Sequence, residues 1–220
     1  MEIKAVLLDI DGTLIDSNDA HANAWVDVGK EFGYDIKFDE VRWLIGMGGD
    51  KVLPEVTGLE EKSELGQKIL DRRGEIFRAQ YLSGLKPFEG TRELLQRISD
   101  EGMKLVVATS ASEEDLEGLL KQAGIEDLID QAANSDDAEE SKPAPDIVEA
   151  ALKRGKVSAG EAIMIGDTPY DIGAATRAGV PIIGFECGGW GAEELRGAMA
   201  IYHGPGDLLD RYSVSVLAKK

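Results

Sequence analysis

The sequence predicts an α/β fold: a doubly wound, Rossmann-like parallel sheet that carries an inserted helical domain. Three observations predict it, namely short and nearly continuous apolar runs, helical patterns between those runs, and one connection that is much longer than a helix with its loops requires. Continuous apolar runs are typical of parallel strands that are covered on both faces.

The strands of the sheet are expected at four apolar runs, which are Ala5 to Leu8, Leu105 to Ala108, Ala162 to Ile165 and Val180 to Phe185. Weaker candidates lie at Leu128 to Ala132 and at Ala198 to Tyr202. Apolar residues at helical spacing fill the intervals, and glycines stand where these helices should stop, at Gly102, Gly124 and Gly179. Strand and helix therefore alternate along the chain.

The connection after the first strand breaks this alternation. Ninety-six residues separate Leu8 from Leu105, whereas a helix joins its strands through loops of about 2–6 residues. Apolar residues at helical spacing, such as Trp25, Val28 and Leu53, indicate several helices here, and Leu65, Ile69 and Phe77 are expected on one buried face. We expect a core domain of residues 1–15 and 86–220 and a helical cap of residues 16–85. Because ligands bind beyond the carboxyl ends of the strands, the cap should act as a lid over the site.

The composition of the chain limits its partners and its location. The 42 acidic and 24 basic residues give a formal charge of -18, which disfavours binding to nucleic acid and to anionic membranes. We expect a cytoplasmic protein, since no signal peptide or membrane span is recognisable. The acidic surface favours a monomer or a small homo-oligomer. The single Cys187 excludes an intrachain disulfide and is expected to be a packing residue.

Four acidic residues follow expected strands and should meet at one crevice if those strands are neighbours: Asp9, Asp11, Asp167 and Asp171. Two carboxylates about 4 Å apart repel by about 4 kcal/mol at an effective dielectric of about 20. A divalent cation can offset such repulsion, and oxygen ligands suit Mg²⁺. The sequence therefore predicts a magnesium site, although each acid taken alone also fits a helix cap or a turn.

Hydroxyl groups, glycine and one lysine accompany these acids. Gly12 and Thr13 suggest an anion cradle beside the metal, and Thr109 with Ser110 ends the second strong strand, where both residues also fit a helix cap. Lys142 stands in "SKPAPD", where the following proline disfavours helical geometry and holds the ammonium group in an extended loop. A lone lysine on an acidic protein is otherwise usually solvated.

With these pieces in place, the sequence resembles the haloacid dehalogenase superfamily, specifically its phosphatase-type members with a helical cap after the first strand. The resemblance covers nearly the whole chain. "DIDGT" at 9–13 resembles the first motif of that family, Thr109 the second, Lys142 the third and "GDTPYD" at 166–171 the fourth. Four motifs in order are more specific than any one of them.

The resemblance implies a Mg²⁺-dependent phosphomonoester hydrolase that acts on a small phosphorylated metabolite. By this resemblance Asp9 is the nucleophile that forms an aspartyl-phosphate, and Asp11 is the general acid and base. Mg²⁺ would be held by the Asp9 carboxylate, the Asp11 backbone carbonyl and Asp167, with Asp171 assisting. Thr109 and Lys142 would hold the phosphate oxygens.

Other functions remain open at this point. Dehalogenating members of the superfamily lack an acid two residues after the nucleophile, so Asp11 argues against dehalogenation. A sugar-phosphate mutase similar to β-phosphoglucomutase is an alternative, because His21 and Trp25 stand where such enzymes carry a similar pair. His21 is a candidate substrate residue on this ground, and also fits a satisfied core histidine.

A receiver-like signalling module is an alternative from another class, but its acceptor aspartate lies on a later strand and it has no cap. The glycine-rich turn at 46–50, which includes Gly48, is expected to lie over the substrate. The sequence leaves the substrate open among phosphoglycolate, sugar phosphates, nucleoside monophosphates and pyrophosphate.

Overall fold

The computed structural model describes residues 2–219 and forms a six-stranded sheet of parallel strands in the order β3-β2-β1-β4-β5-β6. The strands are β1 (Ala5–Leu8), β2 (Lys104–Ala108), β3 (Gln131–Ala133), β4 (Ala162–Gly166), β5 (Ile182–Phe185) and β6 (Ala200–Tyr202). Every apolar run predicted to be a strand overlaps one of them, and the two weaker candidates are β3 and β6. The α/β prediction is therefore confirmed.

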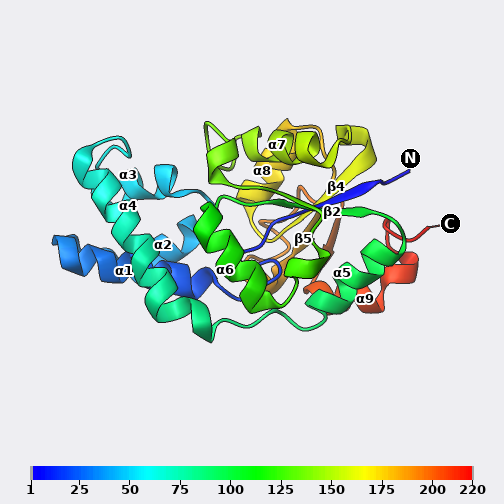
Figure 1. Cartoon of the computed structure of the whole chain (residues 1–220), viewed down its shortest axis with the longest axis horizontal. Helices are drawn as coiled ribbons and strands as arrows, with labels where there is room; N and C mark the ends of the chain where they lie inside the picture. The colour runs from blue at the N-terminus through cyan, green and yellow to red at the C-terminus, as the bar shows by residue number, and fades with distance from the viewer. Residues whose placement is uncertain (1, 220) are drawn as a thin grey trace.

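Helices cover both faces of the sheet, as Figure 1 shows. Val6 and Leu8 of β1 are buried in one apolar cluster with residues of α5 (Thr91–Asp100), α6 (Glu113–Ala123) and α9 (Pro205–Asp210). Ala5 and Leu7 are buried in a second cluster with α7 (Asp146–Gly155) and α8 (Pro169–Arg177). Alternate residues of a strand point to opposite faces, so β1 is apolar throughout because both its faces are covered.

The ends of these helices follow the local sequence. Gly124 ends α6 with φ of 66°, a left-handed conformation that costs glycine little. Thr168 and Asp171 form a capping box at the start of α8, where each side chain accepts a hydrogen bond from the other residue's backbone N–H, and Pro169 occupies the first turn.

The long connection after β1 folds into the helical cap, which lies at one end of the molecule (Figure 1). Its helices are α1 (Asn18–Phe32), α2 (Phe38–Val41), α3 (Gly49–Thr57) and α4 (Glu64–Ile76), with short helical turns at Arg42–Leu44, Phe77–Tyr81 and Leu82–Gly84. Trp25, Val28, Leu53, Ile69 and Phe77 are buried as expected. Leu65 is 41% exposed in the first turn of α4, so its predicted place in the cap core is wrong.

Two linkers join the cap to the sheet and lie side by side. The backbone N–H of Asp16 donates to Lys86 O at 3.0 Å, and that of Phe88 donates to Leu14 O at 3.1 Å. We propose the domain division at 15/16 and 85/86 because the chain crosses between the two parts only through this pair of linkers. Within residues 2–219, no helix has both the length and the apolar character that crossing a membrane requires.

Candidate active site

The two central strands bring the first and fourth motifs together. β1 pairs with β4 so that Leu8 lies opposite Ile165, and the backbone N–H of Asp9 donates to Ile165 O at 3.0 Å. Asp9 and Asp167 therefore leave the sheet at the same edge. The strand order also reverses between β1 and β4, which is where ligands bind in open α/β sheets.

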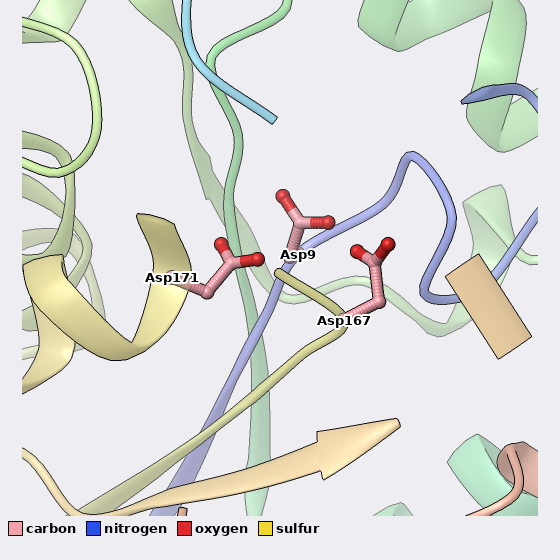
Figure 2. Close-up of side chains that lie close together, drawn as sticks. All are labelled: Asp9, Asp167 and Asp171. Carbon is pink, nitrogen blue, oxygen red and sulfur yellow. The ribbon is translucent and has the colours of Figure 1, made fainter. Parts of the chain in front are cut away.

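Three carboxylates gather at this edge (Figure 2). Asp9, Asp167 and Asp171 are all buried, and each offers a carboxylate oxygen that lies within 4.8 Å of the other two. Asp171 comes from the first turn of α8, where the Thr168 hydroxyl donates to its Oδ2 at 2.6 Å. The predicted convergence of these three acids is what the fold produces.

Lys142 is the cation that contacts this cluster directly. Its Nζ lies 2.5 Å from Asp9 Oδ1 and 2.8 Å from Asp171 Oδ1, and its side chain is 1% exposed. Burial works to lower the pKa of Lys142, but the charges of Asp171 and Asp9 outweigh it and hold the pKa above its usual value. The ammonium is therefore charged, and the solvated alternative is wrong for this lysine.

One ammonium does not neutralise three buried carboxylates. Burial raises the pKa of Asp9 to about 7 although Lys142 opposes it, and burial with the nearby Asp9 charge raises the pKa of Asp167 well above its ordinary value. Thr13 Oγ1 lies 2.9 Å from both Asp9 Oδ2 and Asp167 Oδ1. A hydroxyl has a single hydrogen and can donate to only one of them at a time.

The donor set of the cluster fits a hard divalent cation. All its ligand atoms are carboxylate oxygens, the site is buried, and the acids remain under-compensated without a further positive charge. Asn18 Nδ2 donates to Asp167 Oδ2 at 3.1 Å, which orients this carboxylate in the way that outer partners orient metal ligands.

The fourth predicted acid, Asp11, turns its side chain away from this cluster. Its Oδ1 accepts hydrogen bonds from Ser17 Oγ at 2.5 Å and His21 Nε2 at 2.8 Å, both at the start of the cap. The convergence of four carboxylates is therefore wrong for one of them, since local polar partners hold Asp11 elsewhere. Burial works to raise the pKa of Asp11, but His21 and Ser17 outweigh it and hold the pKa below its ordinary value.

His21 is itself held by the cap. Its ring stacks on Phe77 with centroids 3.9 Å apart, and its Nδ1 lies 3.4 Å from Arg73 NH1. A guanidinium group only donates hydrogen bonds, so Nδ1 is the acceptor and we assign the ring proton to Nε2, which faces Asp11. His21 is therefore a buried histidine with both ring nitrogens partnered, and one of these partners is the acid that the resemblance assigns to proton transfer.

Two joined cavities lie between the cap and the core. The inner one has a volume of about 50 Å³, and its walls include Asp9, Asp11, His21 and Trp25. The outer one has a volume of about 550 Å³. The residues that line both are Gly48, Gly49, Arg73, Thr109, Ser110 and Ala111.

Some of the remaining candidate residues line these cavities, and others lie in the loop beside the acidic cluster. Thr109, Ser110 and Gly48 line the cavities as predicted. The backbone N–H of Gly12 donates to Ile15 O and that of Thr13 to Ile10 O, so neither amide is available to an anion. The Thr13 hydroxyl contacts the acidic cluster instead.

Two glycines behind the cluster let the backbone approach the Asp167 carboxylate closely. Gly12 has φ of 77°, and a Cβ there would lie 2.4 Å from Asp167 Oδ2. A Cβ on Gly188 would lie 1.6 Å from the same oxygen. Gly188, Ser17 and Asn18 were not predicted, and the only signal for the last two was their position beside the first motif.

Cys187 is a packing residue of the same region, as predicted. Its thiol donates to Gly12 O at 3.3 Å, and burial raises its pKa far above the ordinary value, which makes it a poor nucleophile.

Comparison with known proteins agrees with this geometry. Residues 6–185 match the family described as haloacid dehalogenase-like hydrolase. The chain is 36% identical over 181 residues to a protein of Caldanaerobacter subterraneus subsp. tengcongensis that carries the name PpaX, which covers 82% of this chain and 80% of that protein. It is 30% identical to a phosphoglycolate phosphatase of Rhodospirillum rubrum, over 82% of this chain and 78% of that enzyme.

A similar whole fold is found among solved structures. The crystal structure of a hydrolase from Pseudomonas syringae superposes with a TM-score of 0.86 at 27% identity, over 96% of this chain and 98% of that one. The family match, the relatives and the acidic site at the switch point of the sheet agree, and this chain belongs to the haloacid dehalogenase-like hydrolases.

Proposed function

We propose that the chain is a Mg²⁺-dependent phosphomonoester hydrolase of small phosphorylated metabolites that works through an aspartyl-phosphate at Asp9. The observation that carries this proposal is the contrast between two neighbouring acids. Asp9 faces the acidic cluster and Lys142, whereas Asp11 faces Ser17 and His21, and both line the inner cavity. Two carboxyl groups in different surroundings can take two different roles.

The first half of the reaction forms a bond between an Asp9 oxygen and phosphorus. The bond between phosphorus and the alcohol oxygen breaks, its electron pair stays on that oxygen, and the minor protonated form of Asp11 supplies the proton, since His21 and Ser17 outweigh burial and hold the pKa of Asp11 below its ordinary value. In the second half, ionised Asp11 accepts a proton from water as the water oxygen attacks phosphorus, and the bond to Asp9 breaks. Phosphate is released and both acids return to their starting states.

Other residues of the chain position the phosphoryl group. Lys142, from the loop before α7, contacts Asp9, and Thr109, directly after β2, lines the inner cavity; both would hold phosphate oxygens and balance the developing negative charge. Asp9, Asp167 and the Asp11 carbonyl would hold Mg²⁺, with Asp171 assisting through Lys142. When bound, the ion supplies positive charge to the phosphate and to the Asp9 carboxylate.

The test is metal-dependent hydrolysis of p-nitrophenyl phosphate by the purified protein. We expect turnover with Mg²⁺, none in the presence of a chelator, and a loss of at least about 10³-fold in kcat for Asp9→Asn. Asp16→Asn is the matched control, since Asp16 is an exposed linker residue outside the cluster. Turnover that survives in chelator or in folded Asp9→Asn would rule this mechanism out.

A sugar-phosphate mutase is the second candidate, and one observation favours it. His21 and Trp25 both line the inner cavity, at the positions that suggested a mutase from the sequence. Incubation with β-glucose 1-phosphate separates the two functions: release of free phosphate supports the hydrolase, and formation of glucose 6-phosphate supports the mutase.

A further inference from the structure

The outer cavity is where the alcohol portion of a substrate must lie. It shares six lining residues with the inner cavity, and its volume of about 550 Å³ is in the range of small-molecule sites, about 300–1,000 Å³. Ser110 lines both cavities, and its buried Oγ has no hydrogen-bond partner among the described residues. A polar leaving group that passes Ser110 would therefore find an unsatisfied hydroxyl.

The charged side chains that line the outer cavity are mostly acidic: seven carboxylates against the guanidinium groups of Arg73 and Arg78. Arg78 NH1 lies 2.8 Å from Asp115 Oδ1, and its NH2 lies 3.0 Å from Glu114 Oε2. Arg73 NH1 lies 3.6 Å from Asp115 Oδ2. The positive charge of the cavity wall is thus largely balanced by Glu114 and Asp115.

The other acids of this wall leave an excess of negative charge. Glu75 is paired with Arg72, which does not line the cavity. Asp50, Glu61, Asp71 and Glu139 have no cationic partner within 4.0 Å among residues 2–219, although Asp50 accepts a backbone hydrogen bond from Ser141. A second anionic group on a substrate would meet this excess, whereas an ammonium group would be attracted to it.

We infer that the site prefers phosphate monoesters whose alcohol carries an amino group, such as amino sugars or amino alcohols, over esters that carry a carboxylate or a second phosphate. This inference rests on the proposed hydrolase function and adds the charge of the leaving group to it. Arg73 sits at the passage between the two cavities, so an anion would find a favourable partner only next to the phosphate and an unfavourable field beyond it.

The experiment compares three phosphates of similar size and different charge: glucosamine 6-phosphate, glucose 6-phosphate and 6-phosphogluconate. We expect kcat/KM with Mg²⁺ to fall in that order, by at least about fivefold from the first to the last. An acid about 8 Å from a charged group of the substrate changes kcat/KM by roughly twofold for each unit of that charge. Raising the ionic strength should narrow the difference, because screening weakens these interactions.

A charge-neutralising variant links the preference to the cavity. The triple variant Glu61→Gln, Asp71→Asn and Glu139→Gln should reduce the ratio of kcat/KM between glucosamine 6-phosphate and 6-phosphogluconate by about threefold or more. The control triple variant Asp35→Asn, Glu126→Gln and Glu149→Gln removes the same net charge from exposed positions outside the cavity and should leave the ratio unchanged.

The possible failures are distinguishable. Equal or better use of 6-phosphogluconate, or an unchanged ratio in the cavity variant, would overturn the inference and leave the hydrolase standing. Hydrolysis of p-nitrophenyl phosphate together with no hydrolysis of any of the three sugar phosphates would also overturn the inference and leave the hydrolase standing. No turnover of any substrate, p-nitrophenyl phosphate included, would overturn the proposed function and this inference with it.

Discussion

His21 Nε2 lies 2.8 Å from Asp11 Oδ1, although Asp11 follows a core strand and His21 belongs to helix α1 of the cap. This contact holds the pKa of Asp11 below its ordinary value and so favours the ionised carboxylate. In the proposed mechanism, ionised Asp11 is the form that accepts a proton from water when the aspartyl-phosphate is hydrolysed. The cap would then supply a partner to the acid that the second half-reaction requires.

The first prediction concerns this contact. His21→Ala should lower kcat by about 10–10²-fold, because the base loses the group that orients and ionises it. The loss should be similar for p-nitrophenyl phosphate and for an alkyl phosphate, since both substrates pass through the same aspartyl-phosphate. His203→Ala is the control, because His203 is exposed and contacts Glu186, and neither residue belongs to the acidic cluster. A loss confined to the alkyl phosphate would instead assign His21 to protonation of the leaving group.

The second prediction concerns pH. Burial raises the pKa of Asp9 to about 7, so without a cation the neutral, non-nucleophilic form predominates as the pH falls below about 7. At limiting Mg²⁺ we expect kcat/KM to fall through this range. Saturating Mg²⁺ should move the acid limb to lower pH, since a bound cation favours the charged carboxylate. An acid limb that does not respond to the Mg²⁺ concentration would contradict this assignment.

The third prediction concerns the space behind Asp167. Gly188→Ala places a methyl carbon where only 1.6 Å separates it from Asp167 Oδ2, so the carboxylate must move. We expect the Mg²⁺ concentration for half-maximal activity to rise by about 10–100-fold, as for the loss of an orienting metal partner. Gly160→Ala is the matched control, because a Cβ there meets nothing within 4 Å. Equal Mg²⁺ dependence of the two variants would show that Asp167 does not bind the ion.

The fourth prediction concerns the stability of the cap. Tyr81 OH donates to Asp27 Oδ2 at 2.5 Å, and this bond, supported by Lys30, lowers the pKa of Asp27, while burial and Asp27 raise the pKa of Tyr81 to about 12. Asp27 therefore adds stability above its unfolded pKa of about 3.9, and that contribution is lost as the pH falls. Tyr81 adds stability below its unfolded pKa of about 10, and that contribution is lost as the pH rises towards 12.

Tyr81→Phe should accordingly lower the free energy of unfolding by about 1 kcal/mol at neutral pH. The difference from the unmodified protein should shrink below about pH 4 and above about pH 10. Urea unfolding at several pH values measures it. Tyr34→Phe serves for comparison, because the Tyr34 hydroxyl makes no hydrogen bond among residues 2–219. A difference that stays constant with pH would mean that the Asp27 contact adds nothing to stability.

Much of the site could be predicted from the sequence because strand topology decides it. Asp9 and Asp167 follow neighbouring parallel strands, so any chain that folds this way brings them to one edge. Lys142 was also predictable as a positioned charge, since proline follows it in the loop before α7. These residues depend on backbone geometry more than on the details of side-chain packing.

The rest depends on side-chain contacts that no sequence pattern encodes, several of them between distant segments. Asp11 turns towards Ser17 and His21 of the cap, which follow it by six and ten residues. Asn18 reaches Asp167 across 149 residues of sequence. The acidic wall of the outer cavity combines residues of the cap with residues of the core, so its charge emerges only when both parts are in place.

The fifth prediction concerns closure of the cap, which the sequence predicts to act as a lid. Trp43 of the cap lies edge-on to Trp190 with ring centroids 4.8 Å apart, and Tyr170 OH donates to Trp43 O at 2.8 Å. If the cap opens in solution, these contacts break and Trp43, already 46% exposed, becomes more exposed to solvent.

We therefore expect Mg²⁺ with a phosphate mimic to blue-shift the tryptophan emission and to reduce the radius of gyration measured by X-ray scattering. Trp43→Phe should remove most of the emission change and keep the change in scattering. Emission and scattering profiles that are identical with and without the ligands would show that the cap does not move on binding.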